Sequence, residues 1–313
     1  MHKSRFFFVN FFLNKRGVLI DSCRHFFDLA MIKRNLHAMA SVKLNVLHWH
    51  LSEDQGFSIE CLKYPLLHEK GSLNGRYYLQ SEVKEVVRLA DLLGIRVVPE
   101  FDIPSHTTSW FVGYPELSAD KEKNYEVETC YGVLNPVMNL EEETFTFLDN
   151  FFAEMCQLFP DEYFHIGGDE NNGRDWRNSR SIQQFMSKHS FSKTAQVQAY
   201  FTTRVAKCLA EKHKKIPVGW DEVFEGEGIP KQVVIQSWRG KDSMRSATGK
   251  GFKTILSNGY YLDLCQEASL HYLNDPLEDI ESKKSSLVLG GECCMWCTSS
   301  FTSSFRYINL IFF

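Results

Sequence analysis

Short apolar runs alternate with longer amphipathic stretches along this 313-residue chain, and this alternation constrains its fold most strongly. Eight of the runs read as buried β-strands, at Gly17–Asp21, Leu44–His50, Ile95–Glu100, Tyr163–Gly167, Ile216–Trp220, Val233–Trp238, Thr254–Ser257 and Leu287–Gly291. The helical stretches between them include Phe26–Ala40, Ser81–Leu93, Glu141–Phe159 and Thr194–His213. Strands that alternate with helices are typical of βα units and predict an α/β fold with a parallel sheet.

The number of strands distinguishes between the two common α/β architectures. An open doubly wound sheet usually carries a glycine-rich phosphate-binding turn, and neither GxGxxG nor GxxxxGK[ST] occurs in this sequence. Eight strands without such a turn favour a closed (β/α)8 TIM barrel. We expect this barrel to occupy residues 16–298 as one catalytic domain.

The two ends of the sequence fit this barrel less well. Residues 1–15 contain an apolar run interrupted by Asn10, lack a small-residue cleavage site, and predict an irregular N-terminal leader. Residues 299–313 form an atypical apolar tail where an amphipathic helix should follow the eighth strand. We therefore expect the last barrel helix to be missing or replaced, as in a truncated or mis-spliced gene product.

Composition excludes several classes of partner. The formal net charge of -4 gives no sign of a nucleic-acid-binding surface. No run approaches the roughly 18 apolar residues that cross a membrane, so we expect no membrane partner. The nine cysteines are irregularly spaced, which predicts buried thiols with at most one or two disulfides and leaves the redox compartment open.

Polar and aromatic residues gather where the predicted strands end, and this pattern indicates an enzyme. In parallel barrels the carboxyl ends of the strands form the rim on which active sites are built. The residues at these positions are Arg24, His48, His50, Glu100, Asp102, Asp169, Glu170, Trp220, Trp238, Asp263 and Trp296.

The segment from His165 to Glu170 reads as a strand that breaks at two glycines and then delivers two carboxylates. Neighbouring side chains on a strand point to opposite faces, so Asp169 and Glu170 would ordinarily diverge. Gly167 and Gly168 permit an irregular backbone that could aim both carboxylates at one ligand. Two carboxylates beside aromatic side chains that can stack on a sugar are the equipment of a glycosidase.

The sequence is less typical of a metal-dependent amidohydrolase or of a serine hydrolase. His48 and His50 share a strand face and could bind a metal, as in a metal-dependent amidohydrolase. Later strands end in Trp220, Trp238 and Asp263, so histidines hydrogen-bonded to rim carboxylates are favoured, and we expect neither metal nor another cofactor. The Gly-x-Ser-x-Gly turn of serine hydrolases does not occur.

Four segments, at residues 15–26, 43–50, 98–106 and 165–170, carry a resemblance to a known family. They resemble, in order and spacing from Arg16 to Trp296, the β-N-acetylhexosaminidases of glycoside hydrolase family 20, and the general type is similar to the animal lysosomal subunits. The resemblance implies a hydrolase that removes terminal, non-reducing, β-linked N-acetylhexosamine from glycans or glycoconjugates. It also implies a lysosomal or secreted location and leaves a homo- or heterodimer open.

The resemblance further implies a substrate-assisted retaining mechanism, in which the 2-acetamido group of the sugar is the nucleophile. Glu170 would be the general acid, and Asp169 would orient the acetamide and stabilise the charge that forms on its nitrogen. His106 would hydrogen-bond Glu170, backed by Glu53. The residues implied to bind the sugar are Arg24, Trp220, Trp238, Tyr261, Asp263 and Trp296.

The sequence departs from the family pattern at identifiable positions. Glu53 stands where the family usually has Asp, Ser105 where it has Gly, and Thr298 where it commonly has a sugar-binding Glu. The small α/β domain that usually precedes the barrel is also absent from this sequence. An alternative is therefore a catalytically impaired or inactive, truncated hexosaminidase-like protein that binds sugar without hydrolysing it.

Overall fold

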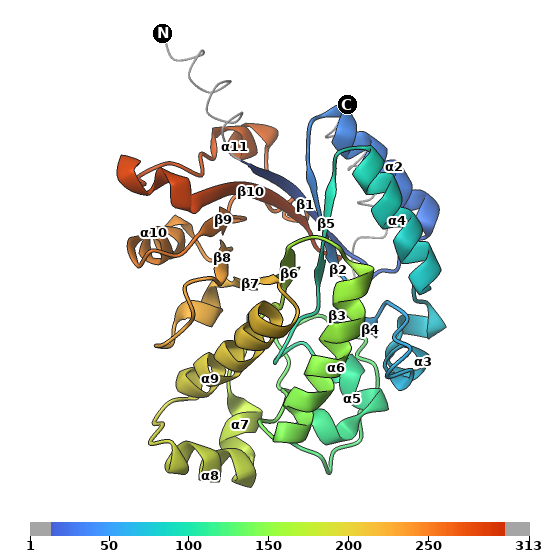
Figure 1. Cartoon of the computed structure of the whole chain (residues 1–313), viewed down its shortest axis with the longest axis vertical. Helices are drawn as coiled ribbons and strands as arrows, with labels where there is room; N and C mark the ends of the chain where they lie inside the picture. Colours follow the sequence, from blue (N-terminus) through green and yellow to red (C-terminus); the bar gives the residue numbers. More distant parts are fainter. Residues whose placement is uncertain (1–13, 298–313) are drawn as a thin grey trace.

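Eight parallel strands close into a barrel at the centre of the molecule (Figure 1), in a computed structural model that describes residues 14–297. Their order around the barrel is β1-β10-β9-β8-β7-β6-β5-β2, and every neighbouring pair is parallel. The strands are β1 (Lys15–Asp21), β2 (Val46–His50), β5 (Arg96–Glu100), β6 (Tyr163–His165), β7 (Ile216–Trp220), β8 (Val234–Ser237), β9 (Thr254–Leu256) and β10 (Val288–Met295). The predicted (β/α)8 TIM barrel is confirmed.

Five longer helices cover the outside of the barrel: α2 (Leu29–Ser41), α4 (Gln80–Leu92), α6 (Glu142–Leu158), α9 (Thr194–Lys207) and α10 (Lys241–Gly249). Helix α2 begins three residues after its predicted start because the Asp28 carboxylate accepts a hydrogen bond from the Met31 amide, at 2.8 Å, and caps the helix. The stretch predicted as one helix from Thr194 to His213 divides into α9 and a π-helical turn at Cys208–Lys212.

Two connections depart from a regular strand–helix repeat. After β7 the chain makes only a 3-10 turn at Asp221–Phe224, and after β9 it forms the short α11 (Ala268–Leu273) and a 3-10 helix at Ser282–Leu287. The barrel therefore lacks a full-length helix at these two places within the described residues.

Additional elements are inserted after three strands, at the carboxyl end of the barrel. The hairpin β3 (Ser52–Glu53) and β4 (Gly56–Phe57) and the helix α3 (Leu66–Gly71) follow β2. Helix α5 (Thr108–Gly113) follows β5, and α7 (Arg174–Asn178) and α8 (Arg180–Lys188) follow β6. These insertions enlarge the rim on which a barrel carries its functional residues.

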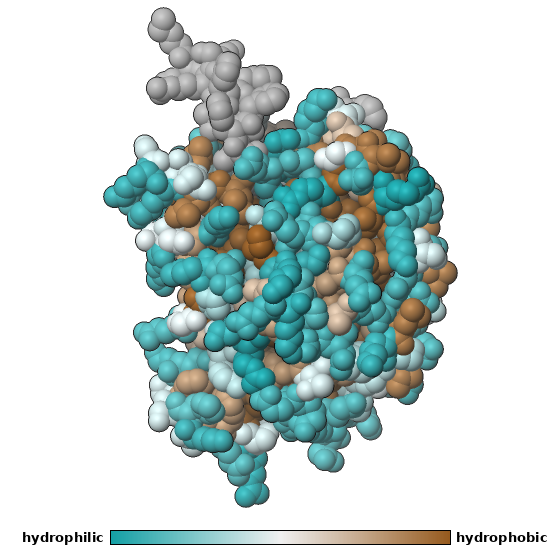
Figure 2. Space-filling view, viewed as in Figure 1, coloured by the Kyte–Doolittle hydropathy of each residue, from teal (hydrophilic) through white to brown (hydrophobic). Residues whose placement is uncertain are grey.

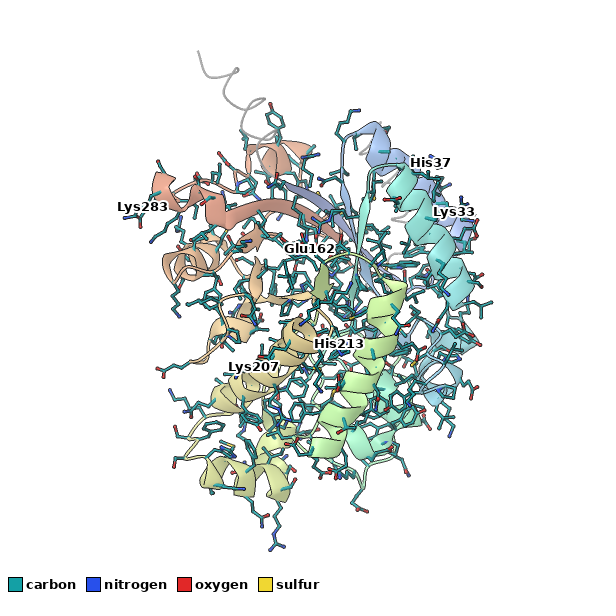
Figure 3. All side chains as sticks on the ribbon, in the orientation of Figure 1. Lys33, His37, Glu162, Lys207, His213 and Lys283 are labelled. Carbon is teal, nitrogen blue, oxygen red and sulfur yellow. The ribbon has the colours of Figure 1, made fainter. Side chains whose placement is uncertain are left out.

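The largest hydrophobic cluster lies between the barrel and its helices. Phe101 after β5 and Phe151 on α6 are fully buried, and their rings meet nearly edge to face with centroids 4.8 Å apart. Hydrophilic side chains cover most of the face shown in Figure 2. On that outer surface Lys33 of α2, at the right of Figure 3, forms an ion pair with Glu85 of α4 at 2.7 Å.

The interior of the barrel, by contrast, is charged. The Lys15 ammonium lies 2.7 Å from Glu292, whose other oxygen lies 2.6 Å from Nδ1 of His48. Nε2 of His48 is 3.0 Å from Glu100, and the same Glu100 oxygen is 2.6 Å from Nδ1 of His50. Burial lowers the pKa of His50, but the Glu100 carboxylate outweighs it and raises that pKa to about 10. These five residues, which we term the axial ladder, lead from the amino end of the barrel towards its carboxyl rim.

Three further observations bear on the sequence predictions. The nine cysteines all lie within the described residues, and no two of them form a disulfide. Between residues 14 and 297, no helix has the length and apolar character needed to cross a membrane. Residues 1–13 of the predicted leader, Thr298 and the predicted tail at 299–313 lie outside the described residues, as does the predicted loss of the last helix.

Candidate active site

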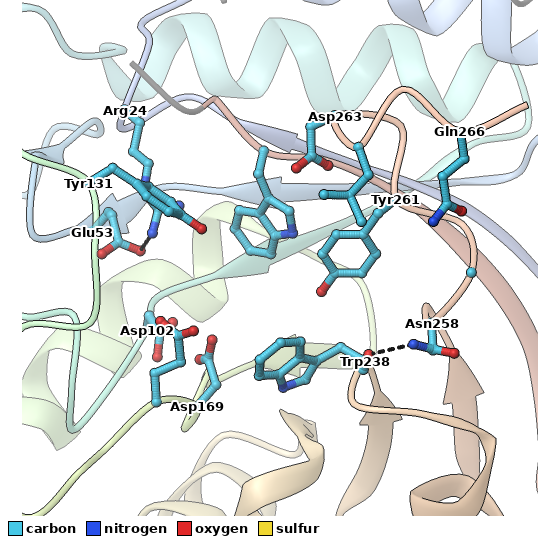
Figure 4. Close-up of a pocket in the computed structure, with 14 residues that line it drawn as sticks. Arg24, Glu53, Asp102, Tyr131, Asp169, Trp238, Asn258, Tyr261, Asp263 and Gln266 are labelled. Carbon is cyan, nitrogen blue, oxygen red and sulfur yellow. Dashed lines mark hydrogen bonds and ion pairs between the residues drawn. The ribbon is translucent and has the colours of Figure 1, made fainter. Parts of the chain in front are cut away.

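A cavity of about 430 Å³ opens at the carboxyl end of the barrel (Figure 4). The side chains that line it come from the ends of strands on all sides of the barrel, as expected for this fold. The predicted site residues among them are Arg24, Glu53, Asp169, Glu170, Trp238, Tyr261, Asp263 and Trp296. The structure therefore brings together most of the predicted set in a single cavity.

The two glycines after β6 deliver the carboxylate pair to this cavity. Gly167 and Gly168 have φ values of +64° and +97°, in the left-handed region that favours glycine. A Cβ on Gly167 would lie 1.8 Å from an Asp102 oxygen, so no side chain fits there. This irregular backbone turns both Asp169 and Glu170 into the cavity, and the prediction of that irregularity is confirmed.

His106 supports Glu170 from the loop after β5. Its Nε2 lies 3.4 Å from a Glu170 oxygen and 4.0 Å from an Asp169 oxygen. Its Nδ1 lies 2.6 Å from Glu53. Burial lowers the pKa of His106, but the adjoining carboxylates, Glu53 foremost, outweigh it and raise that pKa well above its usual value.

The backbone of this loop explains why Ser105 is tolerated in place of glycine. The residue with a positive φ is His106, at 57°, and Ser105 is not among the left-handed positions of the described chain. The Ser105 hydroxyl donates a hydrogen bond to the Asp169 carbonyl oxygen at 2.6 Å. The substitution thus ties the His106 loop to the segment that carries the carboxylate pair.

Arg24 forms an ion pair with Glu53, the carboxylate that also contacts His106. The Arg24 guanidinium lies 2.9 Å from Glu53 and 3.1 Å from Asp21, and Figure 4 shows the pair with Glu53 beside Tyr131. The Tyr131 and Trp296 rings lie on the guanidinium, with centroids 5.3 Å and 5.5 Å from its central carbon. Tyr131 belongs to a loop without periodicity, so sequence reasoning had no signal by which to find it.

Asp169 lies among acidic groups. Burial and the Asp169 charge raise the pKa of Asp102 well above its usual value, which favours the protonated form that can donate a hydrogen bond to Asp169. Burial raises the pKa of Asp169 itself to about 6, although His106 and the hydrogen bond from Asp102 act in the opposite direction. One Asp169 oxygen is buried and has no hydrogen-bond partner among the described residues, so it can accept a hydrogen bond from a ligand.

Glu222 is a second acidic neighbour that the sequence did not single out. It follows β7 by two residues, and its carboxylate accepts a hydrogen bond from the Trp238 indole at 3.0 Å. Burial and the charge of Asp169 raise the pKa of Glu222 to about 8. Asp169 therefore has two acidic neighbours, Asp102 in the wall of the cavity and Glu222 behind Trp238.

Aromatic side chains form the remaining walls. Trp238, Tyr261 and Trp296 line the cavity, and burial raises the pKa of the nearby Asp263 to about 6. Trp220 is only 1% exposed and is not among the lining side chains; its indole donates to Glu100 at 2.7 Å. Its ring centroid lies 5.8 Å from that of Trp296, so Trp220 supports the wall from beneath.

Three clusters near the site have metal-ligating side chains within reach of one another. They are His48 with Glu100 and His165, Glu53 with Asp102 and His106, and His106 with Asp169 and Glu170. Nδ1 of His48 and Nδ1 of His106 each lie 2.6 Å from a carboxylate oxygen, whereas Nδ1 of His165 accepts a hydrogen bond from the Gly167 amide at 3.0 Å. This geometry agrees with the histidine–carboxylate hydrogen bonds favoured by the sequence.

A family comparison decides what this site belongs to. The model of "Glycosyl hydrolase family 20, catalytic domain" matches residues 14–308, which include every cavity residue named above. The chain belongs to glycosyl hydrolase family 20. Its predicted resemblance to the hexosaminidases is thereby confirmed.

Relatives with known names or structures agree with this assignment to family 20. The chain is 36% identical to β-hexosaminidase subunit beta of Felis catus over 90% of this chain and 54% of the relative. It is 36% identical to β-hexosaminidase 1 of Arabidopsis thaliana over 92% of this chain and 52% of the relative. The chain thus spans about half the length of these curated relatives.

Solved structures show the same barrel. The Flavobacterium johnsoniae chitobiase has a TM-score of 0.86 and 40% identity, covering 91% of this chain and 44% of that chain. A family 20 exo β-N-acetylglucosaminidase of Vibrio harveyi, solved in complex with N-acetylglucosamine, has a TM-score of 0.84 and 25% identity, covering 96% of this chain and 53% of that one.

Proposed function

We propose that this family 20 chain is a β-N-acetylhexosaminidase, which hydrolyses terminal, non-reducing, β-linked N-acetylglucosamine or N-acetylgalactosamine. One observation carries the proposal: Asp169 and Glu170 enter the same cavity but have different partners. Glu170 faces His106 at 3.4 Å, whereas Asp169 has a buried oxygen without a partner among the described residues. This asymmetry suits one proton-transferring and one orienting carboxylate.

In the first step the carbonyl oxygen of the sugar's 2-acetamido group attacks the anomeric carbon. Glu170 donates its proton to the glycosidic oxygen, and the aglycone leaves as an alcohol. The free oxygen of Asp169 accepts a hydrogen bond from the acetamide N–H and stabilises the positive oxazolinium that forms. Because the nucleophile belongs to the substrate, the attack gains the usual advantage of proximity.

In the second step water opens the oxazolinium at the anomeric carbon, and Glu170, now a carboxylate, takes the proton of that water. Two displacements at one carbon retain the β configuration. His106, held by Glu53 at 2.6 Å, stabilises the Glu170 carboxylate between the two steps. The second step thus restores the proton that Glu170 gives up in the first, and the two steps together consume none.

The remaining cavity residues hold the sugar. Arg24 binds the C3 and C4 hydroxyls, and Asp263 accepts a hydrogen bond from another hydroxyl. Tyr261 donates to the acetamide oxygen before the attack. The walls around the ring and the acetamide methyl are formed by Trp238 and Trp296, with Trp220 behind them.

Turnover of an aryl N-acetyl-β-glucosaminide tests the activity, and a melting curve with and without a thiazoline analogue of the oxazolinium tests the acetamide pocket. We expect both hydrolysis and a raised Tm. A folded chain that binds the thiazoline without turnover would instead be a sugar-binding protein without hydrolytic activity. A chain whose activity falls on addition of a chelator would favour a metal-dependent reaction.

We also infer glycans or glycoconjugates that end in N-acetylhexosamine as the natural substrates, and a lysosomal or secreted location. Both inferences rest on the similarity to the animal β-hexosaminidase subunits. A homo- or heterodimer is compatible with the same similarity, and sedimentation of the purified chain measures it. Immunolocalisation beside a lysosomal marker tests the location.

A further inference from the structure

The Glu53 carboxylate has four close partners in the site. One of its oxygens lies 2.6 Å from His106 Nδ1 and accepts the Asp54 amide at 2.9 Å. The other lies 2.9 Å from the Arg24 guanidinium and 3.2 Å from His50 Nε2. Glu53 is 1% exposed, so its four contacts use its hydrogen-bonding capacity almost fully.

Two of the basic side chains that contact Glu53, His106 and Arg24, have different roles in the proposed reaction. His106 faces Glu170, whereas Arg24 faces the sugar hydroxyls. The Nε atom of Arg24 is buried and lacks a hydrogen-bond partner among the described residues, so a ligand has a donor left to bind. Burial alone would raise the pKa of Glu53, but Arg24 and His106 together hold it well below its usual value.

We propose that Glu53 is a positioning residue that couples the binding of the sugar hydroxyls at Arg24 to proton transfer at Glu170, by way of His106. The inference rests on the proposed function and adds a link between sugar binding and proton transfer. Arg24 contacts one oxygen of the Glu53 carboxylate and His106 contacts the other, so a shift of the guanidinium towards the sugar must reorient the contact with His106. Binding energy at the far side of the sugar thus serves the chemical step.

The length of the side chain matters to this bridge. An Asp at position 53 would withdraw the carboxylate by about 1.5 Å, one carbon–carbon bond. Contacts of 2.6 Å and 2.9 Å on opposite oxygens leave no slack for that change. The longer side chain of Glu53 therefore allows a single residue to reach both cations.

Four other charged or titratable groups lie beside the Arg24–Glu53–His106 bridge. Asp21 holds the second nitrogen of Arg24, and His50 connects Glu53 to the axial ladder. Asp54 lies 3.4 Å from His106 Nδ1, and Asp169 lies 4.0 Å from Nε2. The carboxylates of Asp21, Asp54 and Asp169 each lie beside Arg24 or beside His106, whereas the Glu53 carboxylate contacts both.

A double-mutant cycle tests the bridge, with Arg24→Lys and His106→Asn measured alone and together. Either substitution releases the Glu53 carboxylate from its bridging orientation. The second substitution should therefore lower kcat/KM less in the single variant than it does in the wild type. We expect the double variant to retain kcat/KM about fivefold above the product of the single effects. The pH at which kcat is half-maximal should also move by about 0.5 unit in Arg24→Lys, although arginine itself does not titrate there.

The matched control pairs Arg24→Lys with Tyr261→Phe, a change in the same cavity without a contact to Glu53 among the described residues. This pair should combine multiplicatively within about twofold. In a Glu53→Asp background the coupling between Arg24 and His106 should fall to the same level. Circular dichroism and Tm confirm that each variant is folded.

Several outcomes would overturn the inference. The inference is rejected if the effects of Arg24→Lys and His106→Asn multiply, if the pH profile does not move, or if the coupling persists fully in Glu53→Asp. In each of these cases, hydrolysis by the wild type still supports the proposed function. If the wild type binds thiazoline but does not hydrolyse, the same cycle is read from thiazoline affinity. A wild type that does neither rejects both proposals.

Discussion

Asp169 and Glu170 are adjacent in sequence, yet different kinds of group surround them on the two sides of the cavity. On the Glu170 side stand two cations, His106 and Arg24, joined through Glu53. On the Asp169 side the neighbours are Asp102 and Glu222, both of which have a pKa raised by burial and by the Asp169 charge.

The difference shows how one dipeptide can perform two tasks. A cation near Glu170 stabilises the carboxylate that remains after the proton has left. The raised pKa values of Asp102 and Glu222 favour their protonated, neutral forms, and Asp102 donates a hydrogen bond to Asp169. Asp169 is then the carboxylate that stabilises the positive charge forming on the substrate. Four experiments test whether Asp169 and Glu170 have these different roles.

Replacement of the acid should have the largest effect. Glu170→Gln keeps the size of the side chain but cannot donate a carboxyl proton, so kcat for a glycoside with a poor leaving group should fall by about 10³-fold. An activated aryl glycoside, which needs less protonation, should lose much less. Steady-state kinetics with a series of leaving groups measures this difference, and equal losses across the series would reject Glu170 as the acid.

Removal of the orienting charge should come next. Asp169→Asn can still accept a hydrogen bond but no longer neutralises the oxazolinium, so kcat should fall by about 10²-fold. The loss should be similar for good and poor leaving groups, in contrast to Glu170→Gln. Wild-type rates in Asp169→Asn would refute the role given to this carboxylate.

The pH dependence should distinguish the two sides without a change of leaving group. Asp169 must be ionised, and burial raises its pKa to about 6 despite the opposing effects of His106 and Asp102. Its active anionic form is present above that pKa and is lost as the pH falls through it. We expect an acidic limb of kcat/KM near pH 6 that is absent from Asp169→Asn, and persistence of the limb would assign it to another group.

The smallest effect concerns stability on the acidic side. The folded pKa of Glu222 is raised to about 8, above its ordinary value, by burial first and by Asp169 second. Such an acid favours the folded state at low pH and loses that contribution as the pH rises from its ordinary pKa to about 8. Glu222→Gln should therefore be more stable than the wild type by about 2 kcal/mol at pH 8, with little difference at pH 4.

Denaturant unfolding at the two pH values measures this change. Glu225→Gln is a suitable control, because Glu225 lies on the same connection and pairs with Arg239 at the surface. A stability difference for Glu222→Gln that does not depend on pH would show that its carboxyl is not the origin of the effect.

The strands were predictable because each is a buried apolar run with few alternatives. Strand β10 extends to Met295, four residues beyond its predicted end, because it pairs with β1 up to Ile20. That extension depends on a partner strand more than 260 residues away, which local periodicity does not reveal. No helix was named between Trp220 and Val233, and the structure forms only the 3-10 turn at Asp221–Phe224 directly after β7.

The site was predictable where a residue lies at the end of a strand and less so where it lies in a loop. Arg24, Trp238 and the carboxylate pair follow strands directly, and the structure places them in the cavity. Tyr131 comes from a long irregular connection, and its place over Arg24 follows only from tertiary packing. The contacts of Glu53 with Arg24, His50 and the Asp54 amide were hidden for the same reason, whereas the family resemblance implied its contact with His106.

The axial ladder has a consequence for how the protein loses its structure. Lys15 comes from the first strand and Glu292 from the last, and their ion pair crosses the seam at which the barrel closes. An open seam would separate Glu292 from Lys15 and from His48, leave the buried Glu292 carboxylate without a cationic partner, and break the chain of contacts that reaches Glu53. Local opening at β1 and β10 should therefore abolish catalysis before the remaining strands separate, so activity would report on the integrity of the seam.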